Sequence, residues 1–211
     1  CDWSSDVCSS DLVQAQFNTI AKTPERYKVE ALQEGMKKPE PTPESMAPAQ
    51  ETSTKPADES KKLWIDRYLS VSYPLQRIRI TSPYGYRKDP FTGKRKFHGG
   101  IDLHARGEQV LAMMEGVVVK VGQDKTSGKY VTLRHGNYTV SYCHLSRVLA
   151  AKGTVVRPRD AVGITGSTGR STGEHLHVTC KLNGKNINPS VLFDYIKSMQ
   201  QECVSALAGL L

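Results

Sequence analysis

Two histidines stand one residue apart in the segment G-E-H-L-H-V, and this spacing constrains the local backbone more than any other feature of the chain. Side chains alternate between the two faces of a β-strand, whereas a helix would turn residues i and i+2 away from each other. The Val178 and Thr179 that follow also favour a strand. We therefore expect His175 and His177 to project together from one face of a strand.

Most of the remaining sequence has the pattern of short strands joined by turns. Apolar runs are separated by turn residues about every 8–12 residues, and no alternation of strands with helices is present. We therefore predict a mainly β, antiparallel fold with a short C-terminal helix that begins at Pro189. The expected strands and turns are Val110–Met113 and Val117–Val121 on either side of Glu115-Gly116, a hairpin of Lys129–Arg134 with Tyr138–His144, and a tight turn at Asn183-Gly184. His135, in the first hairpin's turn, is expected to be solvated.

The composition changes sharply along the chain. Residues 36–62 are rich in Pro, Glu, Ser, Thr and Lys, and such a segment cannot bury enough apolar surface to order itself. Residues 1–12 look like translated sequencing-adaptor sequence, so they are excluded from fold reasoning. The expected organisation is residues 1–12 as an artefact, 13–35 as an N-terminal segment, 36–62 as a linker, 63–198 as the folded domain and 199–211 as a tail.

The charge balance limits the classes of function. Twenty-nine Lys and Arg against 21 Asp and Glu give a net charge of +8, which favours anionic partners. No nucleic-acid motif accompanies this charge, so we do not expect a nucleic-acid binder. No apolar run approaches the length of about 18 residues that a transmembrane helix needs.

Four histidines and one aspartate are the residues best suited to bind a metal ion or transfer protons. His98 and Asp102 flank Gly99-Gly100, a pair that permits a tight turn, and His144, His175 and His177 lie further along the chain. Two histidines and one carboxylate can hold a catalytic zinc ion and leave a fourth position open. The remaining imidazoles could transfer protons. The strand pattern alone does not decide whether His175 or His177 is the metal ligand.

These motifs resemble those of the lysostaphin/LytM-type zinc endopeptidases of bacterial cell walls. The resemblance covers roughly residues 81–192 and is carried by T-S-P-Y-G-Y-R, H-G-G-I-D, Y-C-H-L-S, G-S-T-G-R-S-T-G, G-E-H-L-H-V and N-G-K-N-I-N-P. It implies an antiparallel β-sheet groove in a barrel-like sandwich, the duplicated hybrid motif. It also implies one Zn²⁺ held by His98, Asp102 and His177, with His144 and His175 as catalytic residues.

The same resemblance implies a function. It predicts hydrolysis of peptide cross-links or stem peptides of peptidoglycan, either diaminopimelate cross-links or glycine bridges. The alternative is a non-catalytic wall-binding or hydrolase-activating module. Relatives that have lost metal ligands act in this way. This chain keeps the full ligand set, which favours the enzyme.

Several further residues have less specific signals. Arg87 could meet a substrate carboxylate or be an ordinary surface residue, and Ser167, Thr168 and Ser171 could hydrogen-bond an extended peptide. His104 would project from the same face of a strand as Asp102 and so could lie near the site. A packing or surface role is the more ordinary expectation for it.

Cys143 and Cys180 have the opposite parity to their neighbouring histidines, which predicts that both lie on the far face of the sheet. An oxidising compartment would allow a disulfide between them, but we expect two buried free thiols. Val13 and Ala15 either resemble the small residues of a signal-peptidase site or belong to an ordinary polar segment. The first interpretation predicts a periplasmic or secreted protein whose export signal is truncated. We expect a monomer.

Overall fold

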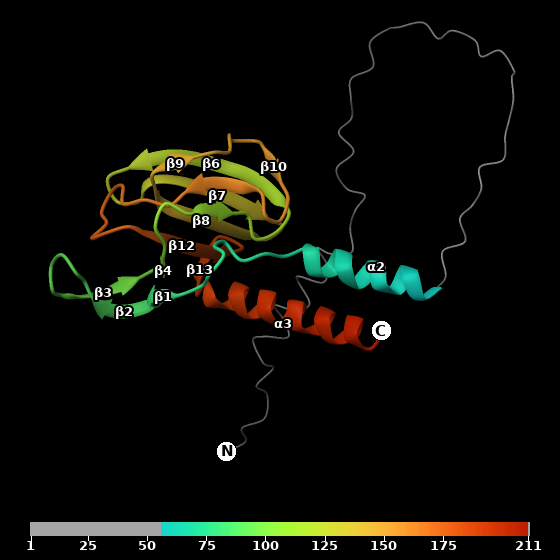
Figure 1. The fold of residues 1–211 in the computed structure, drawn as a ribbon. Coiled ribbons are helices and arrows are strands. Elements are labelled where there is room, and N and C mark those ends of the chain that lie inside the picture. The colour runs from blue at the N-terminus through green and yellow to red at the C-terminus, as the bar shows by residue number, and fades with distance from the viewer. Residues whose placement is uncertain (1–55, 211) are drawn as a thin grey trace, which may run out of the picture. The chain divides into compact units, whose positions relative to one another are not determined.

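The computed structural model describes residues 56–210. Figure 1 shows a β-rich body beside a pair of helices. The predicted boundaries at 12/13 and 35/36, the Val13–Ala15 site and residues 36–55 of the linker lie outside the described residues. The elements are α2 (Pro56–Leu69), β1 (Ile80–Ser82), β2 (Gly85–Lys88), β3 (Arg95–His98), β4 (Ile101–His104), β5 (Gln109–Leu111), β6 (Gly116–Asp124), β7 (Gly128–His135), β8 (Tyr138–Leu145), β9 (Arg147–Val148), β10 (Val155–Val156), β11 (Ala161–Ile164), β12 (His175–Leu182), β13 (Lys185–Ile187) and α3 (Ser190–Ala208).

The largest sheet runs in the order β1-β4-β12-β8-β7-β6-β10, with β13 paired to β12, and every pairing in it is antiparallel. Its order begins at β1 and ends at β10, so the sheet is open. A second sheet has the order β5-β11-β9, and β2 pairs with β3 in a separate two-stranded ribbon. This architecture confirms the predicted mainly β, antiparallel fold.

The two faces of the large sheet differ in chemistry because side chains alternate along each strand. In β12, Leu176, Val178 and Cys180 are buried in the core, whereas the residues between them are half-buried. The core face continues through Val140 and Tyr142 of β8. The opposite face carries His175, His177 and Thr179, so the apolar core fixes which way the histidines point.

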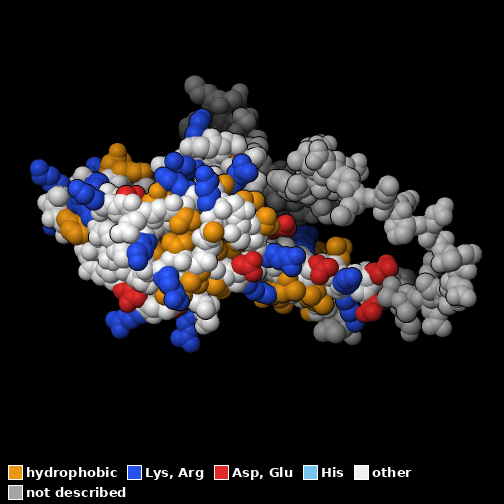
Figure 2. All heavy atoms as spheres, turned by 90° about the horizontal axis from the view of Figure 1, so that it is seen from above, with side chains coloured by type: hydrophobic (Ala, Val, Ile, Leu, Met, Phe, Trp, Pro, Cys, Tyr) orange, Lys and Arg blue, Asp and Glu red, His pale blue; other side chains and the backbone are white. Residues whose placement is uncertain are grey.

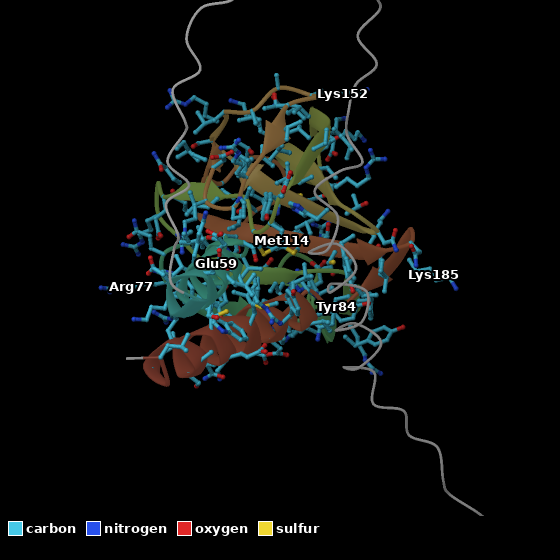
Figure 3. The ribbon with its side chains drawn as sticks, turned by 90° about the vertical axis from the view of Figure 1, so that its right-hand side faces the viewer. Glu59, Arg77, Tyr84, Met114, Lys152 and Lys185 are labelled. Carbon is cyan, nitrogen blue, oxygen red and sulfur yellow. The ribbon has the colours of Figure 1, made fainter. Side chains whose placement is uncertain are left out.

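The helices close one side of this body. Leu192, Ile196 and Met199 of α3 are buried, and Arg67 of α2 donates a hydrogen bond to Met199 and forms an ion pair with Glu202. Figure 3 labels Met114, in the segment between β5 and β6, which lies between the strands and the helices. Figure 2 shows Lys and Arg side chains spread over the face of the β body seen from above, in keeping with the net charge of +8.

Both predicted tight connections are present. β7 and β8 pair antiparallel with His135 opposite Tyr138, and β12 and β13 meet at Asn183-Gly184, whose φ angles are +49° and +80°. Positive φ at both central positions is what a two-residue hairpin turn requires. The strands around Glu115-Gly116 also form, but they do not pair with each other: β5 pairs with β11 and β6 with β7.

Two predicted boundaries fall inside helices. The expected domain start at residue 63 lies within α2, which begins at Pro56, and the expected tail from residue 199 continues α3 as far as Ala208. The helix after Pro189 forms as predicted. Neither helix in residues 56–210 combines the length and apolar character that a membrane-spanning helix needs.

The prediction that His135 is solvated is wrong. Its side chain is fully buried, and its Nδ1 lies 2.9 Å from the Glu115 carbonyl oxygen, to which it donates a hydrogen bond. Nε2 is buried with no hydrogen-bond partner. The turn residue folds inward over the segment before β6, so burial lowers the pKa of His135 despite the bond to Glu115.

We predict that His135 makes folding sensitive to mild acid. Above the pKa of about 6.5 of the unfolded chain, the imidazole is neutral in both states; below it, the unfolded chain binds a proton that the folded protein does not. As the pH is lowered below about 6.5, the free energy of unfolding should therefore decrease, by at most about 1.4 kcal/mol per pH unit for this group. In urea titrations from pH 8 to pH 5, His135→Asn should show a shallower decline, and parallel profiles would contradict the prediction.

Candidate metal centre and active site

A tight turn brings His98 back beside Asp102. His98 ends β3 and Asp102 lies in β4, with Gly99-Gly100 between them. A Cβ on Gly100 would collide with the Val178 carbonyl oxygen and lie 2.7–2.8 Å from the His177 ring, whereas one on Gly99 would meet only Asn186, at 4.0 Å. Gly100 is therefore the residue that allows this turn to lie against β12.

The register of β4 and β12 brings in the third side chain. His177 pairs directly with Asp102, and His175 pairs with His104. Directly opposed residues of antiparallel strands share a face of the sheet. His177 therefore reaches the same space as the turn, from a strand that is 75 residues away in sequence from Asp102.

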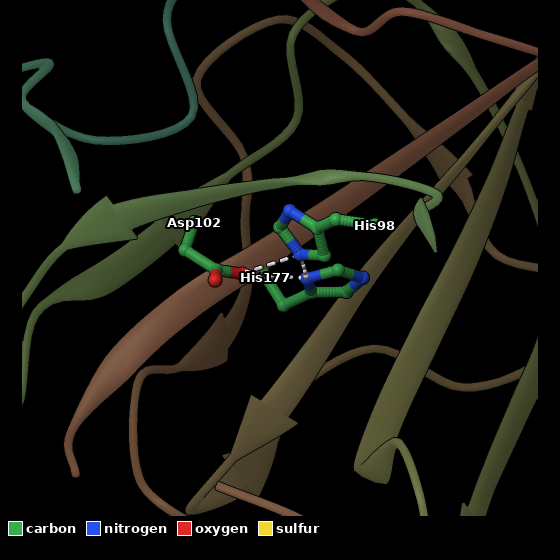
Figure 4. Close-up of side chains that lie close together, drawn as sticks. All are labelled: His98, Asp102 and His177. Atoms are coloured by element: carbon green, nitrogen blue, oxygen red, sulfur yellow. Dashed lines mark hydrogen bonds and ion pairs between the residues drawn. The ribbon is translucent and has the colours of Figure 1, made fainter. Parts of the chain in front are cut away.

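Three potential ligand atoms converge there, as Figure 4 shows. His98 Nε2 lies 3.1 Å from His177 Nδ1 and 3.2 Å from Asp102 Oδ1, and His177 Nδ1 lies 2.6 Å from the same Oδ1. Burial alone would raise the pKa of Asp102, but the neighbouring His177 and His98 side chains outweigh it and hold the pKa well below its usual range. The carboxylate is therefore ionised at neutral pH.

This donor set fits a zinc ion. His98 Nδ1 donates to the Pro83 carbonyl at 2.8 Å, which leaves Nε2 with its lone pair turned toward the other two atoms. Three electron-rich atoms that face one point need a cation or a shared proton between them. Ligands at Zn–N distances of about 2.0–2.1 Å in a tetrahedron lie about 3.3 Å apart. The two distances from His98 match this spacing, and the 2.6 Å pair is as close as a proton-sharing hydrogen bond.

His144 reaches the site through a β-bulge. Lys129 pairs with Leu145 and Val131 with Tyr142, so Cys143 and His144 together oppose the single residue Tyr130. His144 adopts a φ of +62°, which is uncommon for a residue with a side chain. The bulge re-aims its ring, whose centroid lies 4.8 Å from that of His175 and 5.7 Å from that of His177.

Backbone carbonyls orient the rings of His144 and His175. His144 Nδ1 donates to the Thr168 carbonyl at 2.8 Å, and His175 Nδ1 to the Gly173 carbonyl at 2.8 Å. Each ring thereby keeps Nε2 as its free nitrogen. Burial lowers the pKa of His144, so its imidazole is neutral at pH 7 and can accept a proton.

All five side chains line one groove of about 930 Å³. Its floor is the polar face of β12, β8 and β7, and its walls include the β2–β3 ribbon and the loop of residues 166–174. The other lining residues include Arg87, His104 and Ser171. Such an open, polar channel has the form that an extended chain of alternating polar groups would need.

The other predicted peptide-binding residues lie in different surroundings. Arg87 Nη2 is 3.4 Å from Asp102 Oδ2, and Ser171 Oγ is 3.2 Å from His175 Nδ1. The hydroxyl of Thr168 donates to the Leu145 carbonyl and accepts from the Lys129 amide. Ser167 is exposed and donates to Ser171 Oγ.

The expectation that Cys143 lies on the far face is wrong, although Cys180 does lie there. Cys143 pairs with His177 and lines the groove, because the bulge at His144 breaks the alternation on which the parity argument depended. Both thiols are buried and free, as expected. Burial raises the pKa of each to about 12, so they remain protonated.

Sequence reasoning missed the residues that support this site. The carbonyls of Pro83, Thr168 and Gly173 have no signature in the side-chain sequence. Asp89 and Arg170 also line the groove and form an ion pair at 3.0 Å. The segment D-P-F-T-G indicates a turn at Asp89, but nothing local indicates a partner 81 residues away.

Comparison with known proteins agrees with this geometry. Residues 96–189 match peptidase family M23. The chain is also 30% identical to the catalytic domain of the prophage-encoded M23 protein EnpA from Enterococcus faecalis, covering 95% of that structure and 58% of this chain with a TM-score of 0.50. The chain belongs to peptidase family M23.

Two further proteins show a similar likeness. The catalytic domain of lysostaphin from Staphylococcus simulans is 26% identical, with 92% of it and 57% of this chain covered at a TM-score of 0.50, which confirms the lysostaphin-type resemblance. The peptidoglycan DD-endopeptidase ShyC of Vibrio cholerae is 40% identical over 119 residues, which are 55% of this M23 chain and 28% of ShyC. The match thus spans little more than a quarter of that curated relative.

The role of Gly100 predicts a difference between two neighbouring glycine substitutions. Neither Gly99 nor Gly100 adopts a left-handed φ, so the space around each decides the outcome. Gly100→Ala should push the turn away from His177 and weaken zinc binding by at least about 10-fold, on the scale of losing a group that orients a ligand. Gly99→Ala should bind zinc like the unaltered protein.

Competition with a chelating dye would measure both affinities, with circular dichroism as the check on folding. Equal zinc affinities for the two variants would show that the turn does not need this close approach.

Proposed function

We propose that this M23 protein is a zinc-dependent endopeptidase that hydrolyses peptide cross-links or stem peptides of peptidoglycan. The observation that carries the proposal is the convergence of three ligand atoms within 2.6–3.2 Å, beside two further imidazoles on the same groove. Family membership and the name of the relative ShyC support the reaction and the substrate. A non-catalytic module would not need an intact ligand set together with two spare imidazoles.

His98, Asp102 and His177 would hold the zinc ion in this proposal. When bound, zinc supplies Lewis-acid chemistry that polarises the scissile carbonyl and activates water. Arg87 supports the site by its approach to Asp102 Oδ2 at 3.4 Å, which leaves Oδ1 directed toward the histidines. The guanidinium also lines the groove, so it is available to a carboxylate of the substrate.

His144 and His175 would move the protons. His144 is anchored through Nδ1 and neutral at pH 7, so its Nε2 can accept a proton from the attacking water. His175, with its ring 4.8 Å away, can stabilise negative charge or protonate the leaving amine. Ser171 lines the groove and would contact the extended peptide. The same role for Ser167 and Thr168 stays a prediction from the sequence, because both lie outside the groove lining and their hydroxyls bond within the protein.

Peptidoglycan lies outside the cytoplasm, so the proposed substrate places the protein in the periplasm or outside the cell. The protein is further proposed to act as a monomer.

Variants of single histidines test the division of roles. We expect His144→Ala and His175→Ala to keep zinc, measured by mass spectrometry of metals, while hydrolysis falls by about 100- to 10,000-fold, as for loss of a general acid or base. His177→Ala should lose both zinc and activity. Arg147→Ala, at an exposed residue outside the groove lining, is the control and should keep zinc and activity. Full zinc occupancy in His177→Ala would contradict the ligand assignment.

Digestion of purified sacculi tests the reaction itself. Zinc-loaded protein would be incubated with sacculi that have diaminopimelate cross-links and with sacculi that have glycine bridges, and the products identified by mass. Cleaved cross-links or stem peptides in either digest, absent with His144→Ala, are the expected result. Intact fragments in both digests would favour the non-catalytic module.

A further inference from the structure

Asp89 closes the turn between β2 and β3 and is almost fully buried, with 5% of its surface exposed. Its Oδ1 accepts hydrogen bonds from the backbone amides of Phe91 at 2.9 Å and Thr92 at 3.0 Å. An Asp that accepts from the amides two and three residues later fixes the turn that follows it. One function of the carboxylate is therefore local.

The same carboxylate also binds a residue from the opposite wall of the groove. Arg170 Nη2 lies 3.0 Å from Oδ1 and 3.1 Å from Oδ2 of Asp89, and the Arg170 guanidinium lies 4.5 Å from the centre of the Phe91 ring. Lys96 Nζ approaches Oδ2 at 3.7 Å. With these partners Asp89 has little capacity left for a substrate, so its charge serves the protein itself.

Arg170 belongs to the loop that orients both non-ligand imidazoles. Two residues before it, the Thr168 carbonyl accepts from His144 at 2.8 Å, and one residue after it, Ser171 Oγ lies 3.2 Å from His175 Nδ1. The Arg170 backbone amide also donates to the Thr126 carbonyl at 3.0 Å, which ties the loop to the turn between β6 and β7. Displacement of Arg170 would therefore move Thr168 and Ser171, and with them the groups that orient His144 and His175.

The other end of the ion pair leads to the metal ligands. Asp89 follows β2 directly, β2 pairs with β3 throughout its length, and His98 is the last residue of β3. Arg87, in β2, approaches Asp102. The Asp89–Arg170 pair is thus a side-chain link between the ribbon that carries His98 and the loop that orients His144 and His175 (Figure 1 shows the ribbon).

We propose that Asp89 and Arg170 are positioning residues that hold the proton-transferring imidazoles at a fixed place relative to the metal ligands. This inference rests on the proposed function for its catalytic consequence, but the mechanical link can be tested without it. Most residues of the β2–β3 ribbon and of the loop of residues 166–174 are exposed or half-buried, so an ion pair between these two walls helps to keep their spacing. Misplacement of reacting groups by about 1 Å can cost about 100-fold in rate.

Asp89→Asn is the sharpest variant. The amide oxygen of Asn can still accept from the Phe91 and Thr92 amides, so the turn is retained while the charge that binds Arg170 is removed. Arg170→Ala removes the other partner, and Arg170→Lys restores a cation that can reach the carboxylate. Asp66→Asn and Arg147→Ala are the matched controls, because both residues are exposed and lie outside the groove lining.

We expect Asp89→Asn and Arg170→Ala each to lower kcat by about 10- to 100-fold, with KM and zinc content close to those of the unaltered protein. The double variant should be no slower than the slower single variant, because both remove one link. Arg170→Lys should regain part of the lost kcat, and the controls should retain full activity.

Hydrogen–deuterium exchange of the zinc-free and zinc-loaded protein supplies a readout that does not depend on catalysis. In both forms, Asp89→Asn and Arg170→Ala should speed exchange of peptides that cover residues 166–174, with peptides of the core strand β8 unchanged before His144. A protein without peptidase activity would defeat the proposed function while leaving this comparison valid.

Three results would overturn the inference. One is unchanged exchange of the loop in both variants. Another is a raised KM in Arg170→Ala with Asp89→Asn unaffected, which would indicate that Arg170 contacts the substrate directly. The last is additive losses of kcat in the double variant, which would mean that the two residues act separately.

Discussion

The pairing of β4 with β12 is the constraint on which the site depends. It sets His177 opposite Asp102, and the core face of β12, with Leu176 and Val178 buried, fixes the direction in which the histidines point. A slip of one residue would turn the histidines into the core and Leu176 into the groove. The hydrophobic core thus specifies the position of the polar centre, although it contributes no ligand to it.

Much of this arrangement follows from the sequence. The H-x-H spacing indicated a strand and a shared face, and the Gly99-Gly100 pair indicated the turn that returns His98 to Asp102. The resemblance to a known family was needed to choose His177 over His175 as the third ligand. In the structure, His177 Nδ1 lies 2.6 Å from Asp102 Oδ1, whereas the closest approach of His175 to the same oxygen is 3.7 Å.

The wrong or missing predictions have physical causes that a local sequence pattern does not reveal. Parity placed Cys143 on the wrong face because the bulge at His144, with its φ of +62°, interrupts the alternation. His135 was expected in solvent because turns are usually exposed, yet it folds inward to reach the Glu115 carbonyl. The Asp89–Arg170 ion pair joins residues 81 positions apart, and only the folded chain brings them together.

The two kinds of imidazole differ in what holds them. His98 and His177 are arranged by a tight turn and a strand register, whereas His144 and His175 are oriented by carbonyls of the loop of residues 166–174. In the proposed function, His98 and His177 bind zinc whereas His144 and His175 carry protons, so zinc binding and proton transfer should respond to different substitutions. The proposed reaction depends first on the three ligands.

X-ray absorption at the zinc edge, on protein loaded with one equivalent of zinc, would identify these ligands. If His98, Asp102 and His177 bind the ion, its neighbours are nitrogen and oxygen at about 2.0–2.1 Å, with the outer-shell scattering of two imidazoles. A sulfur neighbour at about 2.3 Å, which the nearby Cys143 would supply, or the absence of imidazole scattering would contradict this assignment.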